Sequence, residues 1–269
     1  MRNQTVLTLL IIALAACGSD DPAPAERVSR PAAEPAHAPS ESIYKAAVEH
    51  ADRTDADRAR DAGRRPAEVL EFFGIEAGMD ILDMFSGGGY YTEILSRVAG
   101  AEGSVVAHSN EAYAQFVGEE ATNRYASNRL ANVKILMAEN QALEFPNNAF
   151  DAVLMVLAYH DVYYVAPKNG WPKINGPKLV AELFDALRPG GILGVVDHYA
   201  AAGSGRETGN SLHRIDPEIV ISELLAAGFV LEEKSDLLRN MDDDHSLNMS
   251  DPKVRGKTDR FVLRFRKPR

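Results

Sequence analysis

Residues 80–92, Asp-Ile-Leu-Asp-Met-Phe-Ser-Gly-Gly-Gly-Tyr-Tyr-Thr, constrain the fold of this 269-residue chain more than any other stretch. A short apolar run ends at the carboxylate of Asp83, three consecutive glycines follow, and a helical pattern begins at Thr92. This order predicts a strand, a tight turn and a helix. A turn without Cβ atoms lets a ligand approach the backbone closely, and a helix N-terminus offers free N–H groups. Since one such turn is a weak signal, other segments must decide what it binds.

The first residues have the pattern of a signal peptide. Arg2 precedes an apolar run over residues 6–16, whose eleven residues are too few to cross a hydrocarbon core about 30 Å thick. The run ends in Leu-Ala-Ala-Cys, which resembles the lipobox of bacterial lipoproteins. The resemblance implies cleavage before Cys17 and lipid attachment to its sulfur. A plain secretory signal with a chance cysteine is the alternative.

Cys17 is the only cysteine, so the remaining domain would have no disulfide and no thiolate metal site. Residues 17–40 are rich in Pro and Ala with almost no large apolar side chain, which predicts a disordered tether. We therefore expect a signal peptide over 1–16, a lipidated cysteine and tether over 17–40, and one globular domain over 41–269. Such a protein would be exported and lipid-anchored to a membrane, facing the periplasm.

The charge balance argues against nucleic acid as a partner. The formal net charge is −10, whereas phosphate contacts need clusters of basic side chains. The most heavily charged segment, residues 52–65, interleaves arginines with aspartates. A solvated face is the favoured interpretation of this segment, and a cover over a ligand pocket is the alternative.

Runs typical of strands alternate with helical patterns through the rest of the chain. Strands are expected at residues 81–83, 104–108, 133–137, 150–157, 192–196, 229–231 and 260–265. Helices are expected at residues 41–50, 66–73, 92–99, 110–125, 177–187 and 217–227. This alternation predicts an α/β fold with a Rossmann-like, doubly wound sheet. In such sheets ligands lie at the carboxyl ends of the strands, so polar residues just after a strand are site candidates.

Three segments in the expected order resemble class I S-adenosylmethionine-dependent methyltransferases. Residues 83–89 resemble the glycine-rich first motif of that family, 139–151 resemble its passage from third to fourth strand, and 187–192 resemble the turn before its fifth strand. The later stretches 213–216 and 256–261 resemble a less characterised bacterial subgroup. The resemblance implies a seven-stranded sheet whose last strand is antiparallel.

The same resemblance implies S-adenosylmethionine as the cofactor. It implies that Gly87 and Gly89 pass close to the methionine part of the cofactor, that Glu139 lies near its adenine amino group, and that Tyr159 lies over the reaction centre. The cofactor-binding set expected on this basis is Asp83, Ser86, Gly87, Gly88, Gly89, Ser109, Glu139 and Tyr159.

Two positions depart from the family pattern. Phe85 stands where the family has its first glycine, and Ser109 stands where it has an acid that binds both ribose hydroxyls. Glu111 follows shortly and would substitute if the loop bulges. A charged hydrogen bond of this kind contributes about 1.5–3 kcal/mol, so its loss would weaken cofactor binding about tenfold to a hundredfold.

Ionisable side chains are expected to gather where the fourth and fifth strands end. His160 and Asp161 follow the fourth strand, Asp197 and His198 follow the fifth, and His213 lies in the crossover after it. One interpretation is loop stabilisation by a carboxylate that orients a histidine. A second is acid–base catalysis on the acceptor, with His160 or His198 as base beside Asp161. A third is a divalent metal held by Asp161, Asp197 and a histidine, since some catechol-type methyltransferases place metal-binding carboxylates after these strands.

Aromatic residues are expected at the same rim, the edge of the sheet where the fourth and fifth strands end. Tyr159, Tyr163, Tyr164 and Trp171 either pack in the core or form a wall of a small-molecule pocket. The function expected from all these features is methyl transfer from S-adenosylmethionine to a small-molecule acceptor. The alternatives are a non-catalytic module that binds a nucleoside-like ligand in the same pocket and a metal-dependent hydrolase.

Overall fold

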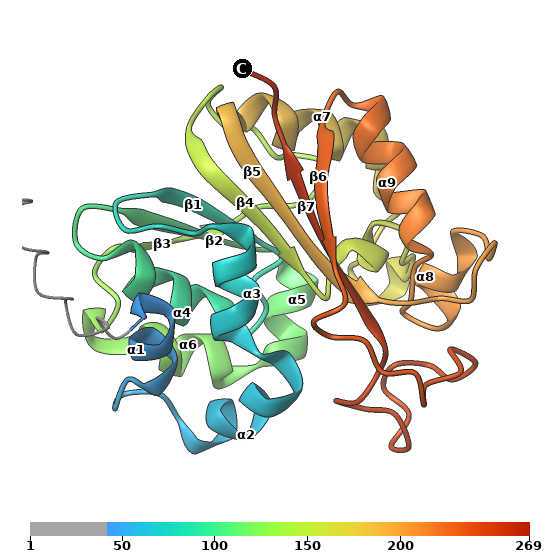
Figure 1. Cartoon of the computed structure of the whole chain (residues 1–269), viewed down its shortest axis with the longest axis horizontal. Coiled ribbons are helices and arrows are strands. Elements are labelled where there is room, and N and C mark those ends of the chain that lie inside the picture. Colours follow the sequence, from blue (N-terminus) through green and yellow to red (C-terminus); the bar gives the residue numbers. More distant parts are fainter. Residues whose placement is uncertain (1–41) are drawn as a thin grey trace, which may run out of the picture. The chain divides into compact units, whose positions relative to one another are not determined.

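A seven-stranded sheet organises the fold, with its strands in the order β3-β2-β1-β4-β5-β7-β6 (Figure 1). The strands are β1 (Asp80–Met84), β2 (Ser104–Ser109), β3 (Val133–Met137), β4 (Phe150–Val156), β5 (Leu187–His198), β6 (Val230–Ser235) and β7 (Arg260–Arg266). Strands β1 to β5 pair in parallel, whereas β7 runs antiparallel to β5 and β6. The predicted Rossmann-like sheet with an antiparallel last strand is therefore confirmed.

The computed structural model describes residues 42–269. The predicted signal peptide, Cys17 and the tether over 17–40 lie outside the described residues, and these features stay predictions. Among the helices of the described part, none combines the length and the apolarity needed to cross a membrane.

Helices follow the strands as the alternating pattern predicts. They are α1 (Ile43–Glu49), α2 (Asp55–Arg64), α3 (Pro66–Phe73), α4 (Tyr90–Ala99), α5 (Glu111–Val117), α6 (Glu119–Tyr125), α7 (Gly176–Ala186), α8 (Glu207–Ser211) and α9 (Pro217–Ala226). Short 3₁₀ helices are η1 (Ala126–Asn128), η2 (Tyr159–Val162) and η3 (Pro167–Asn169). The single helix expected over 110–125 is two helices, because Gly118 has a φ of +58° and a ψ of −130° at the junction.

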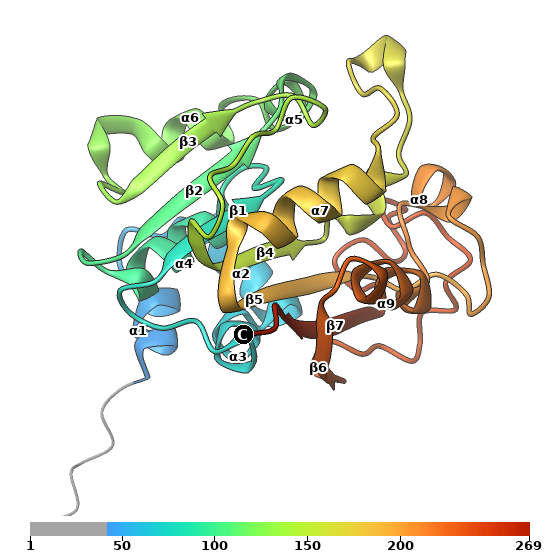
Figure 2. The same ribbon diagram turned by 90° about the horizontal axis from the view of Figure 1, so that it is seen from above.

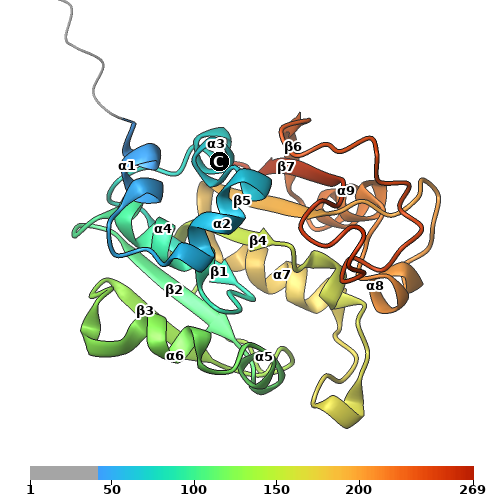
Figure 3. The ribbon, with the colours of Figure 1, turned by 90° about the horizontal axis from the view of Figure 1, so that it is seen from below.

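Side chains that alternate along the central strands divide the core between the two faces of the sheet. Ala152 and Leu154 of β4 pack with the cluster of α1, α3 and α4, whereas Val153 and Met155 pack with that of α7 and α9. Figure 2 shows α7 crossing one face, and Figure 3 shows α2 and α3 in front of the opposite face. The continuous apolar character of β4 follows from this burial on both sides.

The charged segment 52–65 lies partly inside the protein, which corrects its interpretation as a solvated face. Arg53 is 4% exposed and Asp57 is fully buried. The guanidinium of Arg124 lies 2.7 Å from Asp57 and 2.6 Å from Glu93, and its Nε donates to the carbonyl oxygen of Gly88 at 2.6 Å. The alternating charges therefore form a buried network that joins α2, α4 and α6 beside the glycine turn.

Candidate functional site

The strand β1 ends at the carboxyl edge of the sheet, where the glycine turn follows it. Asp83, near its end, is 3% exposed and accepts a hydrogen bond from Thr92 Oγ1 at 2.6 Å. Burial raises the pKa of Asp83 to about 7, although the hydrogen bonds from Thr92 oppose this effect. Its carboxyl group thus ties β1 to the first turn of α4.

The three consecutive glycines have different surroundings. Gly87 has a φ of +56°, and a Cβ added there would meet nothing closer than 3.9 Å. A Cβ on Gly88 would overlap the carboxylate of Glu120, and one on Gly89 would overlap the hydroxyl of Tyr125. Of the two glycines expected to approach the cofactor, Gly87 therefore faces free space, whereas Gly89 lets α6 pack closely on the turn.

Phe85 fills the space next to the turn. It has a φ of +58°, a left-handed conformation that side chains rarely adopt, and its ring is buried. The ring centroid lies 5.4 Å from that of His108 and 5.8 Å from those of Tyr113 and Trp171. At the position where the methyltransferase motif that this turn resembles has a glycine, the chain thus has an aromatic side chain that contacts His108, Tyr113 and Trp171.

The end of β2 offers no carboxylate at the expected ribose position. Ser109 is 7% exposed, and Asn110 caps α5 by accepting the N–H of Tyr113 at 2.8 Å. The exposed Glu139 accepts the backbone N–H of Glu111 at 3.3 Å. As the sequence indicated, β2 therefore ends at a serine, Ser109, where the family motif has an acid.

A cavity of about 350 Å³ opens beyond the carboxyl ends of β4 and β5. Its aromatic walls include Tyr113, Phe116, Tyr164 and Trp171. Its polar side chains include His160, Asp161 and His213. The predicted rim therefore exists, and two of the four aromatic residues expected there, Tyr164 and Trp171, form part of its wall.

Tyr159 points away from this cavity, which corrects its expected place over the reaction centre. The side chain is fully buried and donates a hydrogen bond to Glu223 of α9 at 2.8 Å. Tyr163 donates to the same carboxylate. Tyr159 thus belongs to the hydrophobic core, whereas the next two residues of η2, His160 and Asp161, line the cavity.

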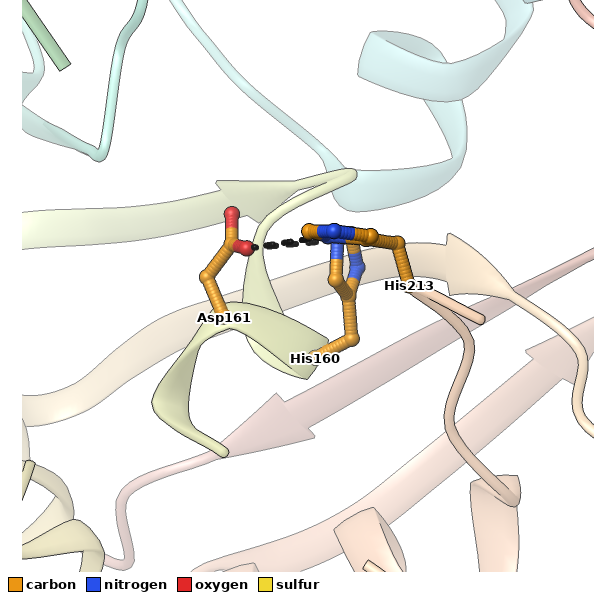
Figure 4. Close-up of side chains that lie close together, drawn as sticks. All are labelled: His160, Asp161 and His213. Carbon is orange, nitrogen blue, oxygen red and sulfur yellow. Dashed lines mark ion pairs between the residues drawn. The ribbon is translucent and has the colours of Figure 1, made fainter. Parts of the chain in front are cut away.

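His160 is held by a carboxylate from the neighbouring strand. Its Nδ1 lies 2.8 Å from Asp197 Oδ1, and its backbone N–H donates to Asp197 Oδ2 at 2.7 Å. Its Nε2 lies 3.4 Å from Asp161 Oδ1, and Nδ1 of His213 lies 3.6 Å from the same oxygen (Figure 4). Burial by itself would lower the pKa of His160, but the charges of Asp197 and Asp161 outweigh it and raise this pKa to about 9.

His198 and Asp197 do not reach the cavity, which corrects their expected roles as a base and a metal ligand. Both lie within β5, opposite Arg260 and Phe261 of β7, and not in the loop after the strand. The Nδ1 of His198 lies 2.6 Å from Thr258 Oγ1, and burial beside Arg260 keeps the pKa of His198 well below its ordinary value. The Asp197 oxygens already accept three N–H groups, from His160 and His198.

The structure adds residues that the expected catalytic set lacked. His213 reaches the cavity from the crossover after β5 with a left-handed φ of +51°. Asn248, Met249 and Ser250 reach it from the long loop before β7. The stretch beginning at His213 was a visible signal, whereas nothing in the composition of the loop before β7 indicated a contact with the rim.

Comparison with known proteins identifies a methyltransferase domain. Residues 82–195 match the family described as methyltransferase domain. The ubiquinone/menaquinone biosynthesis C-methyltransferase UbiE of Marinomonas sp. is 29% identical over 125 residues, 46% of this chain and 44% of that protein. The UbiE of Pasteurella multocida is 30% identical over 130 residues, 48% of this chain and 43% of that protein. The chain thus spans less than half the length of these relatives.

Solved structures share the fold. A SAM-dependent methyltransferase from Aquifex aeolicus matches with a TM-score of 0.55 and 20% identity, over 80% of this chain and all of that one. The [4+2]-cyclase SpnF matches with a TM-score of 0.52 and 21% identity, over 79% of this chain and 81% of that one. Residues 82–195 therefore match a methyltransferase domain, and the chain shares the fold of these solved structures.

The glycine turn fits the cofactor that this family implies. Gly87 leaves free the space that a Cβ would fill. The N-cap of α4, Gly89, makes no side-chain capping bond, so the N-terminus of α4 suits a carboxylate such as that of the methionine part. Ser86, Gly87 and Glu139 remain the predicted contacts, and Ser109 would offer the ribose a hydroxyl group in place of a carboxylate.

Proposed function

We propose that the protein transfers a methyl group from S-adenosylmethionine to a small aromatic molecule bound in the cavity beside His160. The proposal rests on the cavity itself, which has aromatic walls and contains His160, held by Asp197, at the carboxyl ends of β4 and β5. Its volume of about 350 Å³ lies within the range of small-molecule sites. Tyr113 links it to the glycine turn, because its ring both lines the cavity and stacks on Phe85.

The chain's own residues would position the acceptor. The bound cofactor would supply an electrophilic methyl group on a sulfonium sulfur. Holding an acceptor in line with such a group contributes several kcal/mol to catalysis. His160 is the candidate to orient the acceptor's oxygen, because Asp197 fixes its Nδ1 and its Nε2 lies on the side of Asp161.

The wall of the cavity favours a planar acceptor. Tyr164 and Trp171 lie with their ring centroids 6.0 Å apart, and Tyr113 lies 5.1 Å from Trp171. Such rings stack on aromatic ligands at little entropic cost. The similar UbiE proteins are named for C-methylation in ubiquinone and menaquinone biosynthesis, which supports a hydroxylated aromatic or quinone-like acceptor here.

Calorimetry with S-adenosylmethionine and with its demethylated product tests the cofactor. We expect binding by the wild type, and a loss of about tenfold or more in Gly87→Ala, whose new Cβ would stand in the ligand's space. Gly78→Ala is the matched control, since Gly78 also has a positive φ, of +83°, with nothing within 4 Å of its added Cβ. Gly78 precedes β1, at the opposite edge of the sheet. No heat and no thermal shift at millimolar cofactor would refute the proposal.

A non-catalytic binding module is the second candidate. The absence of a carboxylate at Ser109 and the presence of Phe85 favour it, because both depart from the methyltransferase motifs that the sequence otherwise resembles. Incubation with S-adenosylmethionine and a panel of hydroquinones separates the two functions. Release of the demethylated product only when an acceptor is present supports transfer, whereas binding without release under any acceptor supports the module.

We further propose that the protein is exported and lipid-anchored at Cys17, facing the periplasm. The proposal rests on the sequence Leu-Ala-Ala-Cys after a short apolar run. Metabolic labelling with a fatty acid should mark the wild type and leave Cys17→Ser unlabelled. Equal labelling of both proteins would refute lipid attachment at this residue.

A further inference from the structure

We propose that His160, Asp161 and His213 form a binding site for one divalent first-row transition metal ion. Each residue offers a ligand atom, and the three atoms lie within 4.8 Å of one another. Figure 4 shows the carboxylate of Asp161 and the two rings converging from η2 and from the crossover after β5. Asp161 Oδ1 lies 3.4 Å from His160 Nε2 and 3.6 Å from His213 Nδ1.

The two separations from Asp161 Oδ1 are close to those that a bound metal requires. Bonds of about 2.0–2.2 Å from zinc to nitrogen and oxygen place neighbouring ligand atoms about 3.0–3.5 Å apart. Small rotations of the side chains would therefore complete the coordination. The ring centroids of His160 and His213 lie 5.3 Å apart with an angle of 86° between the planes, and one nitrogen of each ring lies within 4.8 Å of the Asp161 carboxylate.

Outer partners already orient two of the three ligands. Asp197 binds Nδ1 of His160 and leaves Nε2 on the side of Asp161. Tyr113 donates its hydroxyl to Asp161 Oδ2 and leaves Oδ1 on the side of the histidines. A carboxylate that binds the second nitrogen of a metal-bound histidine is the common outer partner of such ligands. Asp197 is therefore a positioning residue, and not a ligand as the sequence suggested.

The local charge also suits a cation. Asp161 is 6% exposed and Asp197 is fully buried. Within residues 42–269, every ion pair of these two carboxylates is made with a histidine. Buried carboxylates are usually paired with a cation or bound to a metal. Two nitrogens and one oxygen favour a metal of the manganese-to-zinc series over magnesium or calcium, which prefer oxygen.

All three ligands line the cavity, so the remaining coordination positions would face a bound molecule. An acceptor that carries adjacent hydroxyl or carbonyl oxygens would fit those positions. This identification of the acceptor class rests on the proposed methyl transfer, whereas the metal site itself does not. Metal binding measured without S-adenosylmethionine therefore separates a failure of the metal site from a failure of the proposed function.

Titration of the full-length chain in detergent, after treatment with a chelator, tests the site. Mn²⁺, Co²⁺ and Zn²⁺ are added separately and followed by calorimetry, and Co²⁺ is also followed by its visible absorption. We expect one ion per chain and a cobalt spectrum of nitrogen and oxygen ligands. Failure of all three ions to bind in a one-to-one ratio would overturn the proposal.

Three variants identify the ligands. His213→Gln should lose binding by at least about a hundredfold, and Asp197→Asn should weaken it about tenfold to a hundredfold by releasing His160. His245→Gln is the matched control, because His245 also has a positive φ, of +65°, and pairs with the carboxylate of Asp259 at 3.0 Å. Thermal unfolding confirms that each variant is folded. Wild-type affinity in folded His213→Gln, or equal losses in His213→Gln and His245→Gln, would contradict the assignment.

Discussion

Replacement of Asp83 by asparagine should change the pH dependence of folding. Asp83 is 3% exposed, and burial raises the pKa of its carboxyl group from the ordinary value of 3.8 to about 7. In the unfolded chain the carboxyl releases its proton near pH 3.8, whereas in the folded protein it keeps the proton until about pH 7. The folded state therefore binds more protons across this window, so the free energy of unfolding falls as the pH rises through it.

The magnitude follows from the two pKa values. At about 1.4 kcal/mol for each pKa unit, ionising the buried carboxyl costs about 4 kcal/mol in total. Between pH 5 and pH 8 the free energy of unfolding of the wild type should therefore fall by roughly 2–3 kcal/mol. An asparagine at this position cannot ionise, and its carbonyl oxygen can still accept the hydrogen bond from Thr92. The stability of Asp83→Asn relative to the wild type should therefore improve by roughly 2–3 kcal/mol between pH 5 and pH 8.

Urea unfolding of both proteins, followed by circular dichroism at half-unit steps between pH 5 and pH 8, measures this difference. The comparison cancels the pH dependence of all other groups. A difference between the two proteins that stays constant across the whole range would refute the argument, because Asp83 would then have an ordinary pKa. A difference that changes in the opposite direction would indicate a charged partner for the carboxylate.

Three further changes test the packing around the site, each measured by urea unfolding. Arg124→Met should destabilise the fold by about 2–3 kcal/mol, because the buried carboxylates of Asp57 and Glu93 each lose one of their arginine partners; a loss below about 1 kcal/mol would contradict the buried network. Gly194→Ala should cost about 1–3 kcal/mol, since its Cβ would lie 2.8 Å from the ring of Phe73; full stability would mean that the ring moves aside freely. Tyr159→Phe should cost about 1–2 kcal/mol by removing the hydrogen bond to Glu223, with cofactor binding unchanged; weakened cofactor binding at full stability would restore Tyr159 to the site.

The parts of the fold that depend on local pattern could be predicted from the sequence. The strand, glycine turn and helix of residues 80–99 follow from a short apolar run, consecutive glycines and helical spacing. The alternation of such units predicted the sheet, and the resemblance supplied its antiparallel last strand. The early start of β5 at Leu187 was missed, because Arg-Pro-Gly-Gly normally ends an element. Here Leu187 pairs with Phe150 before an irregularity in the ladder.

The direction of single side chains depends on contacts distant in sequence, so the sequence could predict the rim and not every residue on it. Tyr159 bonds to a carboxylate 64 residues further along the chain. Asp197 and His198 are held inside the sheet by β7, which a strand boundary estimated from apolar residues alone does not reveal. His213 reaches the cavity from a backbone of positive φ, which the sequence pattern does not reveal.

The interleaved charges of residues 52–65 wrongly indicated a solvated face for a similar reason. A run of opposite charges has the composition of a solvent-exposed helix. The partner that buries it, Arg124, lies 67 residues beyond Asp57. Such a network is recognisable only after the helices have been placed side by side.

The guanidinium of Arg124 determines how the glycine turn can open. Because Arg124 binds the carbonyl of Gly88 together with carboxylates of α2 and α4, the turn cannot loosen without breaking contacts to three helices at once. Local opening is then cooperative, and the backbone amides of residues 86–89 should exchange with solvent at the rate of α6 and not as an independent loop. The rate at which a ligand enters the turn would therefore depend on the joint motion of α2, α4 and α6.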